Sequence, residues 1–245
     1  MKKLIKKQTV SIIATLVLVF TSCAQSGKYI KGNGDTKTIT RTTTEYDGIK
    51  CAGSMDFVIV SGSEGHITIE GEENLLEYII TEVKNNNLIV KTRKGINLKS
   101  SKNKTIKITI PFEDISHVSL AGSGDLWNED TITATKLNIS LAGSGDVALD
   151  IKTSSTKASI AGSGDLKLKG DTNNLEAKVA GSGDFHGFNL QANNTEVSVA
   201  GSGDAKVVSN KTLKARVAGS GDIAYRGNDP IVDSKVSGSG SISTN

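Results

Sequence analysis

Short stretches in the second half of the chain alternate apolar and polar residues, one stretch after another. Four of them are Leu137–Leu141, Leu175–Val179, Thr195–Val199 and Leu213–Val217, and similar stretches such as Val147–Ile151 lie between them. A period of two is the signature of a strand with one buried face. The pattern therefore predicts an all-β chain made of many short strands.

Between the strands lies a repeated tetrad, Gly-Ser-Gly-Asp, which occurs six times, each time after an alanine. A seventh copy, at Gly238, reads Gly-Ser-Gly-Ser. Successive copies are 18 to 21 residues apart, and a fixed period of this length indicates a stack of similar small units. Each unit is a strand, a glycine turn, a second strand and a polar corner, which leaves no room for a helix. The first glycines of the six full copies are Gly122, Gly143, Gly162, Gly181, Gly201 and Gly219.

In such a stack, equivalent residues of successive units lie above one another at about 4.8 Å. The sequence therefore predicts a parallel β-helix with rungs of about 19 residues, regular over residues 118–245. An antiparallel propeller or barrel is the alternative, but it needs longer repeats or hairpin turns between all strands. The expected inward column just before the turn is Leu120, Leu141, Ile160, Val179, Val199, Val217 and Val236.

The first half of the mature chain is less regular, and the period lapses between Gly53 and Gly122. Gly32–Asp35 and Gly53–Asp56 resemble degenerate copies of the turn. In the second of these, Met55 replaces a glycine, so no left-handed backbone is expected at that position. One domain, residues 37–245, is predicted, because solenoid rungs share one core. Its irregular part is expected to hold a helical turn at 72–78, a hairpin turn at 85–87 and a mobile loop at 100–104.

The N-terminus has the features of an export signal. Four lysines in Met1–Lys7 precede an apolar run, Val10–Phe20, which is too short to span a membrane permanently. Residues 1–22 are therefore predicted to be a signal peptide. Thr21-Ser22-Cys23 resembles a bacterial lipobox, which implies cleavage before Cys23, lipidation of Cys23 and a flexible tether over residues 23–36. The alternative is an ordinary signal peptide in which Cys23 has no special role.

Removal of the signal peptide changes the charge of the protein. The chain has 29 basic and 26 acidic residues, and loss of Lys2, Lys3, Lys6 and Lys7 leaves 25 against 26. The basic character thus comes from the leader, and no basic face with interspersed aromatics suggests nucleic acid. The other cysteine, Cys51, aligns with the inward column and is expected to be a buried apolar residue.

The aspartates of the tetrad are the one repeated ionisable constellation. If they stack, neighbouring carboxylates repel each other by roughly 1 kcal/mol even in water. In one interpretation each carboxylate accepts backbone N–H bonds in its own turn. In the other, calcium ions lie between rungs, but calcium prefers six or more oxygens and one carboxylate per rung supplies too few. The turn interpretation is favoured, with no cofactor. The residues are Asp125, Asp146, Asp165, Asp184, Asp204 and Asp222.

No catalytic constellation is recognised. His66, His117 and His186 have no Cys or second His at metal-ligand spacing. The Gly-x-Gly of each tetrad precedes a strand, so no helix N-terminus is available to hold a phosphate.

Six segments of the first half follow one another in a fixed order along the chain. They are Gly32–Gly34, Thr40-Arg41, Tyr46–Ile49, Ser54–Val60, Ile67–Asn74 and Asn87–Val90. Together with the downstream tetrads they resemble the head GIN domain, a family described as an autotransporter adhesin head and common in lipoproteins of Gram-negative bacteria. The resemblance implies a right-handed β-helix, a location in the cell envelope and adhesin-like binding, and it supplies no catalytic residues.

We therefore expect a non-catalytic lipoprotein of the outer membrane, facing either the periplasm or the exterior, that acts as an adhesin-like binding or structural module. Its expected partners are the membrane, through the lipid, and a protein or glycan ligand. The terminal rung suggests a monomer or a weak homodimer. Two alternatives remain from the sequence: a calcium-stabilised extracellular spacer, and a β-helix polysaccharide lyase or hydrolase, which would need acidic clusters, basic partners and aromatic platforms.

Overall fold

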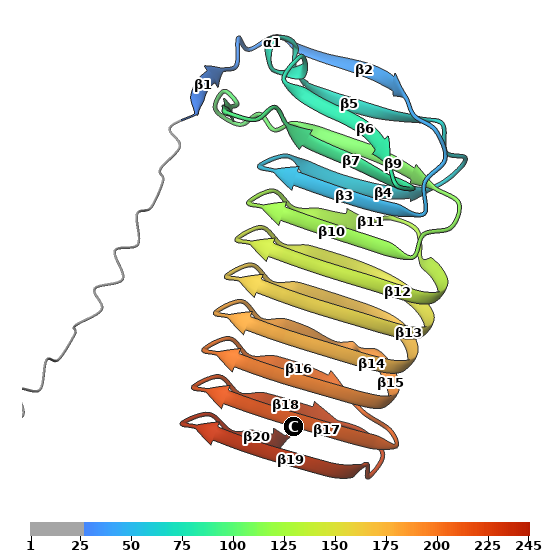
Figure 1. The fold of residues 1–245 in the computed structure, drawn as a ribbon, viewed down its shortest axis with the longest axis vertical. Helices are drawn as coiled ribbons and strands as arrows, with labels where there is room; N and C mark the ends of the chain where they lie inside the picture. The colour runs from blue at the N-terminus through green and yellow to red at the C-terminus, as the bar shows by residue number, and fades with distance from the viewer. Residues whose placement is uncertain (1–26) are drawn as a thin grey trace, which may run out of the picture.

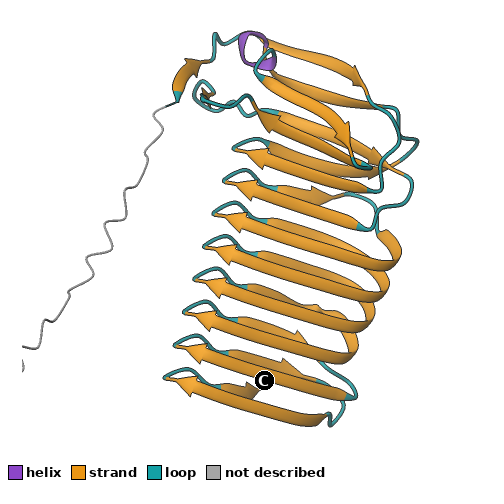
Figure 2. Cartoon of the chain, in the orientation of Figure 1, coloured by secondary structure: helices purple, strands orange, loops and turns teal. Residues whose placement is uncertain are grey.

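The computed structural model describes residues 27–245 as a column of stacked strands with a less regular end (Figure 1). Strands account for nearly all of the regular structure, and teal turns line one edge of the column (Figure 2). The parallel β-helix predicted from the repeat is confirmed. Its strands are β3 (Gly48–Gly53), β4 (Asp56–Ser61), β10 (His117–Gly122), β11 (Leu126–Asn128), β12 (Ile132–Gly143), β13 (Val147–Gly162), β14 (Leu166–Gly181), β15 (Phe185–Gly201), β16 (Ala205–Val208), β17 (Thr212–Gly219), β18 (Ile223–Arg226), β19 (Ile231–Gly238) and β20 (Ile242–Thr244).

The register of the rungs follows the sequence repeat. Gly122 of β10 lies beside Gly143 of β12, which in turn lies beside Gly162 of β13. The predicted inward column from Leu120 to Val217 is buried throughout. The interval from Gly181 to Gly201 is one residue longer than the interval before it because β15 carries a bulge: its register against β14 shifts between Lys167 and Lys169, so this rung holds an additional residue.

The corners opposite the glycine turns are partly filled by hydroxyl groups. β13, β14 and β15 run through these corners as continuous strands (Figure 1). Thr156 and Thr172 are buried there, and the hydroxyl of Thr153 lies 2.7 Å from that of Thr156 and donates to that of Thr172 at 2.8 Å. Hydrogen bonding within the corner offsets the cost of burying these polar groups.

The irregular region is an insertion between two rungs that are neighbours in space. β3 and β4 form a rung whose two neighbours are β10 and β11 on one side and β7 (Asn87–Thr92) and β9 (Lys107–Phe112) on the other. The chain therefore builds its first complete rung, turns back to add another on the N-terminal side, and then passes to β10.

Antiparallel strands close this N-terminal end. β5 (His66–Glu72) pairs with β9 and with β2 (Thr36–Thr42), and β6 (Ile79–Lys84) pairs with β7. The expected hairpin turn is present between β6 and β7, with positive φ at Asn85 and Asn86. The expected helical turn is α1 (Glu73–Leu76), which buries Leu75 and Leu76 over the end of the core.

The turn expected at Gly53–Asp56 is part of the column, since Gly53 pairs with Gly122. The turn expected at Gly32–Asp35 is not, and this prediction is wrong. That segment wraps around the carboxylate of Glu72, which accepts hydrogen bonds from the amide of Gly34 at 2.6 Å and from the hydroxyl and amide of Ser101. The bonds from Ser101 hold the pKa of Glu72 below its usual value.

Two segments expected to be flexible are held by contacts in this region. β1 (Lys28–Lys31), within the expected tether, pairs in parallel with β8 (Ile96–Lys99). The expected mobile loop at 100–104 is tied to Glu72 through Ser101. The signal peptide, Cys23 and the start of the tether lie outside the described residues. Across residues 27–245, no helix has the length and apolarity to cross a membrane.

The facing of the strands predicts the effect of two neighbouring substitutions. Val179 is 2% exposed, with Ile160 and Val199 as its rung partners, so Val179→Asp places an unpaired charge in a dry core. We expect a loss of about 3 kcal/mol or more in the free energy of unfolding. Lys178 points outward, and Lys178→Asp should lower the melting temperature far less. Equal melting temperatures for the two variants would contradict the assigned facing.

Candidate functional site

The glycine turns form a continuous edge along the column, and stacking dictates their sequence. The first glycine of each tetrad has a φ between 126° and 137°, which favours glycine. In the turn at Gly143, the amides of Ser144 and Gly145 both donate to the carbonyl of Gly122 in the preceding rung, at 2.9 and 3.0 Å. Each first glycine thus accepts two hydrogen bonds from the next rung.

The second glycine of the tetrad is required by close approach rather than by its φ. A Cβ at Gly145 would lie 1.9 Å from the carbonyl oxygen of Gly124, and the other second glycines are similarly placed. Met55 is tolerated because it begins this column of residues, with no glycine turn on its N-terminal side. The expectation that Met55 needs no left-handed backbone is confirmed, since Met55 does not have a positive φ.

The six aspartates stack in one column, and each carboxylate does accept a backbone N–H. The donor, however, is the amide of the next rung's aspartate rather than an amide of the same turn. For example, the amide of Asp184 donates to Asp165 Oδ1 at 2.9 Å, and the amide of Asp204 donates to Asp184 Oδ1 at 2.7 Å. The series runs from Asp125 to Asp222 and ends at Ser241, whose amide and hydroxyl both donate to Asp222 Oδ1. The serine and second-glycine amides of each turn donate to a glycine carbonyl of the preceding rung. The aspartate carboxylate accepts the one amide that remains, so these three amides of each turn all have an acceptor.

One place in this column brings an imidazole to the carboxylates. His186 Nε2 lies 3.5 Å from Asp165 Oδ2, and Asp184 is close enough for the three side chains to share an ion. Asp165 and Asp184 each already use Oδ1 for a backbone amide. Two carboxylates and one nitrogen are also a poor match for the six to eight oxygens that calcium prefers. We therefore assign the ladder to turn pairing.

A hollow lies beside the aspartates on the face formed by the strands that follow the turns. Trp127 on β11 has Ala148 as its partner in the next rung, followed by Lys167 and His186. The small Ala148 leaves a cavity of about 270 Å³ between the indole and the longer side chains, edged by Asp125, Asp146 and Asp165. The ammonium of Lys107 lies 5.9 Å from the centroid of the indole, so a cation–π contact helps to hold the ring.

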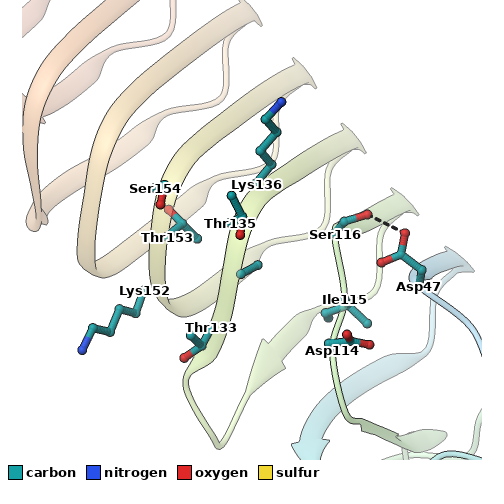
Figure 3. Close-up of a pocket in the computed structure, with 11 residues that line it drawn as sticks. Asp47, Asp114, Ile115, Ser116, Thr133, Thr135, Lys136, Lys152, Thr153 and Ser154 are labelled. Atoms are coloured by element: carbon teal, nitrogen blue, oxygen red, sulfur yellow. Dashed lines mark hydrogen bonds between the residues drawn. The ribbon is translucent and has the colours of Figure 1, made fainter.

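A larger, more open groove lies where the inserted region meets the column (Figure 3). Asp47 faces it from the segment before β3, but its carboxylate accepts a hydrogen bond from Ser116 at 2.8 Å. Lys136 and Lys152 point away from this pair in Figure 3. The groove has no aromatic residue in its lining and brings no set of free polar groups together. It is the weaker candidate for a binding site.

The remaining candidates from the sequence contribute little to either hollow. Cys51 is buried, as expected, and burial raises the pKa of its thiol well above the usual value. Burial also lowers the pKa of His117. Trp127 was not singled out by the sequence analysis, although one signal was available: it is the only indole in the chain and interrupts an outward column of small and charged residues.

The role of the aspartates can be tested by two substitutions at one rung. Asp165→Asn keeps an oxygen for the amide of Asp184 and removes the repulsion from neighbouring carboxylates, so its melting temperature should be equal to or above that of the parent. Asp165→Ala leaves that part-buried amide without its acceptor and should cost about 1 kcal/mol. Thermal melts with and without calcium make the comparison. If calcium raises the melting temperature of the parent but not that of Asp165→Asn, the result would instead support an ion between the rungs.

Comparisons with known proteins agree with this architecture. A "putative lipid binding protein" from Parabacteroides distasonis is 28% identical, with a TM-score of 0.76, over 89% of this chain and all of that one. A "putative adhesin" from Bacteroides fragilis is 26% identical, with a TM-score of 0.79, over 88% of this chain and all of that one. A "putative adhesin" from Parabacteroides merdae, at 23% identity and a TM-score of 0.68, shares the fold.

Among curated proteins, none has a significantly similar sequence. The family described as "Putative auto-transporter adhesin, head GIN domain" matches residues 45–229, which is most of the described chain. The match covers both the inserted region and the regular rungs, and it confirms the resemblance seen in the sequence. This protein therefore belongs to the head GIN domain family.

Proposed function

We propose that this protein is a lipid-anchored protein of the cell envelope that binds a carbohydrate in the hollow beside Trp127. A cell-envelope or surface location agrees with the adhesin family to which the chain belongs. The family and the two neighbours above 25% identity are described as adhesin or binding proteins, which favours a non-catalytic role. Anchoring through Cys23 to the outer membrane is the finer part of the proposal, and it rests on the leader sequence.

The observation that carries the ligand class is the composition of the hollow. An indole offers a flat apolar surface of the kind on which the C–H face of a sugar ring packs, and it combines this with a polar edge. The neighbouring carboxylates of Asp125 and Asp146 accept hydrogen bonds, as sugar hydroxyl groups require. Lys167, on the opposite side, adds a donor. A neutral or amino sugar at the end of a glycan suits these side chains better than an acidic sugar does, because the carboxylates at the edge of the hollow would repel a negative charge.

The name of the Parabacteroides distasonis neighbour suggests a second ligand class, a lipid. The hollow beside Trp127 and the interior of the column do not favour it for this chain. The interior of the column is filled by side chains from every rung, from Phe57 at one end to Ile223 at the other. The hollow beside Trp127 is shallow and bordered by charges, whereas an acyl chain requires an enclosed apolar cavity.

Anchoring predicts a dependence on one side chain. Cys23→Ser removes the thiol that a lipid would modify, and it should release the protein from the membrane fraction or stop its maturation. Fractionation of cells expressing the variant and the parent, with immunodetection, is the measurement. Cys51→Ser, which alters only the buried thiol, serves as the control for loss of a cysteine. Membrane attachment of Cys23→Ser at the level of the parent, with the leader removed as judged by its mass, would exclude the lipid anchor.

Carbohydrate binding predicts a dependence on the indole. On a glycan array the parent should bind a defined set of glycans, and Trp127→Ala should lose that binding while Trp127→Phe, which keeps an aromatic face, retains part of it. Phe188→Ala is a matched control, since Phe188 packs against Arg226 elsewhere on the column. Melting temperatures show whether each variant is folded. Absence of binding by the parent, or full binding by Trp127→Ala, would refute the proposed site.

A further inference from the structure

The two ends of the column differ in how they are covered. At the N-terminal end, α1 lies over the core with Leu75 and Leu76 buried. At the other end, β19 pairs only with β17 and β20 only with β18 among the described residues. Val232 and Val236 of β19 continue the inward columns but are each 41% exposed. The equivalent residues one rung earlier, Leu213 and Val217, are 1% and 3% exposed.

The backbone of β19 presents a regular set of free hydrogen-bonding groups at this open edge. The amide of Ile231 donates to Lys211 of the preceding rung, and farther along the amide of Ser239 donates to Gly219. Backbone groups of successive residues point to opposite sides of a strand, so the odd-numbered residues of β19 face β17. Val232, Ser234 and Val236 therefore direct their N–H and C=O groups to the open edge, where β19 has no partner strand within residues 27–245.

The sequence of β19 is complementary to itself in the antiparallel direction. If two copies are aligned about Ser234, Val232 lies opposite Val236 of the second copy, and Asp233 lies opposite Lys235. The residues with free amides then face one another and form hydrogen-bonded pairs, as the geometry of an antiparallel ladder requires. The valines join the two cores, and the charged residues form cross-strand pairs of opposite sign on the outer face. Within its own chain the carboxylate of Asp233 is paired with Arg216 at 2.5 Å, so Lys235 of the second copy would join an existing ion pair.

We propose that two copies of this chain associate through β19 in an antiparallel, two-fold arrangement centred on Ser234. A shift by one residue in either copy would place the free amides opposite amides already bonded to β17, so the register is determined by the backbone as well as by charge. The interface is isologous and closes after two copies, which distinguishes it from a contact that propagates into fibres. An unpaired strand edge is also the feature of a β-sheet most ready to pair with another chain.

The dimer would join two columns end to end, with their N-terminal regions at the far ends (Figure 1). If residue 23 carries a lipid, as proposed above, this arrangement suits pairing between copies anchored on two facing surfaces. That consequence rests on the proposed anchor, whereas the pairing of β19 does not. The experiments below use processed protein purified in detergent, so that they report on pairing whether or not the lipid is present.

A cysteine at the two-fold axis provides the first test. Ser234→Cys would place two thiols in one hydrogen-bonded pair, with Cα atoms about 5.5 Å apart, within the range of about 4.4–6.8 Å seen in disulfides. Mild oxidation should convert most of this variant to a dimer on a non-reducing gel. Ser237→Cys is a matched control on the same exposed strand, because its two copies would be about 20 Å apart. Cross-linking of Ser237→Cys, or none of Ser234→Cys, would overturn the proposed register.

A charge exchange provides the second test, read by light scattering or sedimentation. Lys235→Glu and Asp233→Lys each convert both charge pairs from attractive to repulsive, and each alone should weaken self-association by roughly tenfold. Because Asp233→Lys also removes the ion pair with Arg216, the melting temperatures of both variants are compared with that of the parent. An equimolar mixture should associate like the parent, since opposite charges then face each other again. Lys206→Glu, an exposed charge reversal away from the edge, should leave association unchanged. A monomeric parent at high concentration, open-ended assembly, or single variants that associate like the parent would each refute the proposal.

Discussion

The contact between successive glycine turns determines the geometry of the whole column. Each first glycine accepts two amide hydrogen bonds from the next rung, and each second glycine passes so close to the one before it that a side chain could not fit. These contacts permit one register only, since a slip by one residue would put a side chain against a backbone oxygen. The inward columns, the corners and the aspartate ladder all take their positions from this edge.

A fixed register means that each outward position becomes a column of neighbours running along the surface. Where the repeat is regular, these columns carry short or charged side chains, and opposite charges in neighbouring rungs form ion pairs, as between Lys214 and Glu196 at 2.6 Å. A binding surface can arise only where a rung departs from the repeat. Trp127 beside Ala148 is such a departure, and so is His186 beside Asp165. The site we propose is thus a local irregularity supported by a rigid, repetitive scaffold, the arrangement that keeps a shallow hollow in a fixed shape.

The inserted region has the opposite character, because it is held by individual contacts rather than by repetition. Glu72 is 2% exposed, and its carboxylate joins the segment around Gly34 to that around Ser101. Its lowered pKa means that this contribution to stability is present above the ordinary pKa of a glutamate, and it is lost as the pH falls through the value in the folded protein. The cap closes one end of the column, and the other end keeps the open edge of β19.

The repeat in the sequence predicted the parallel β-helix, its register and its buried columns, because period-two strands at a fixed spacing from a glycine turn place equivalent residues of successive rungs above one another. It also located the hairpin at Asn85 and the helical turn before Tyr78. Only the tertiary structure decided that Gly32–Asp35 surrounds Glu72, that the aspartates bond between rungs, and that Trp127 borders a hollow. These features depend on contacts between residues far apart in the chain, and local sequence patterns carry information about neighbours along the chain rather than across it.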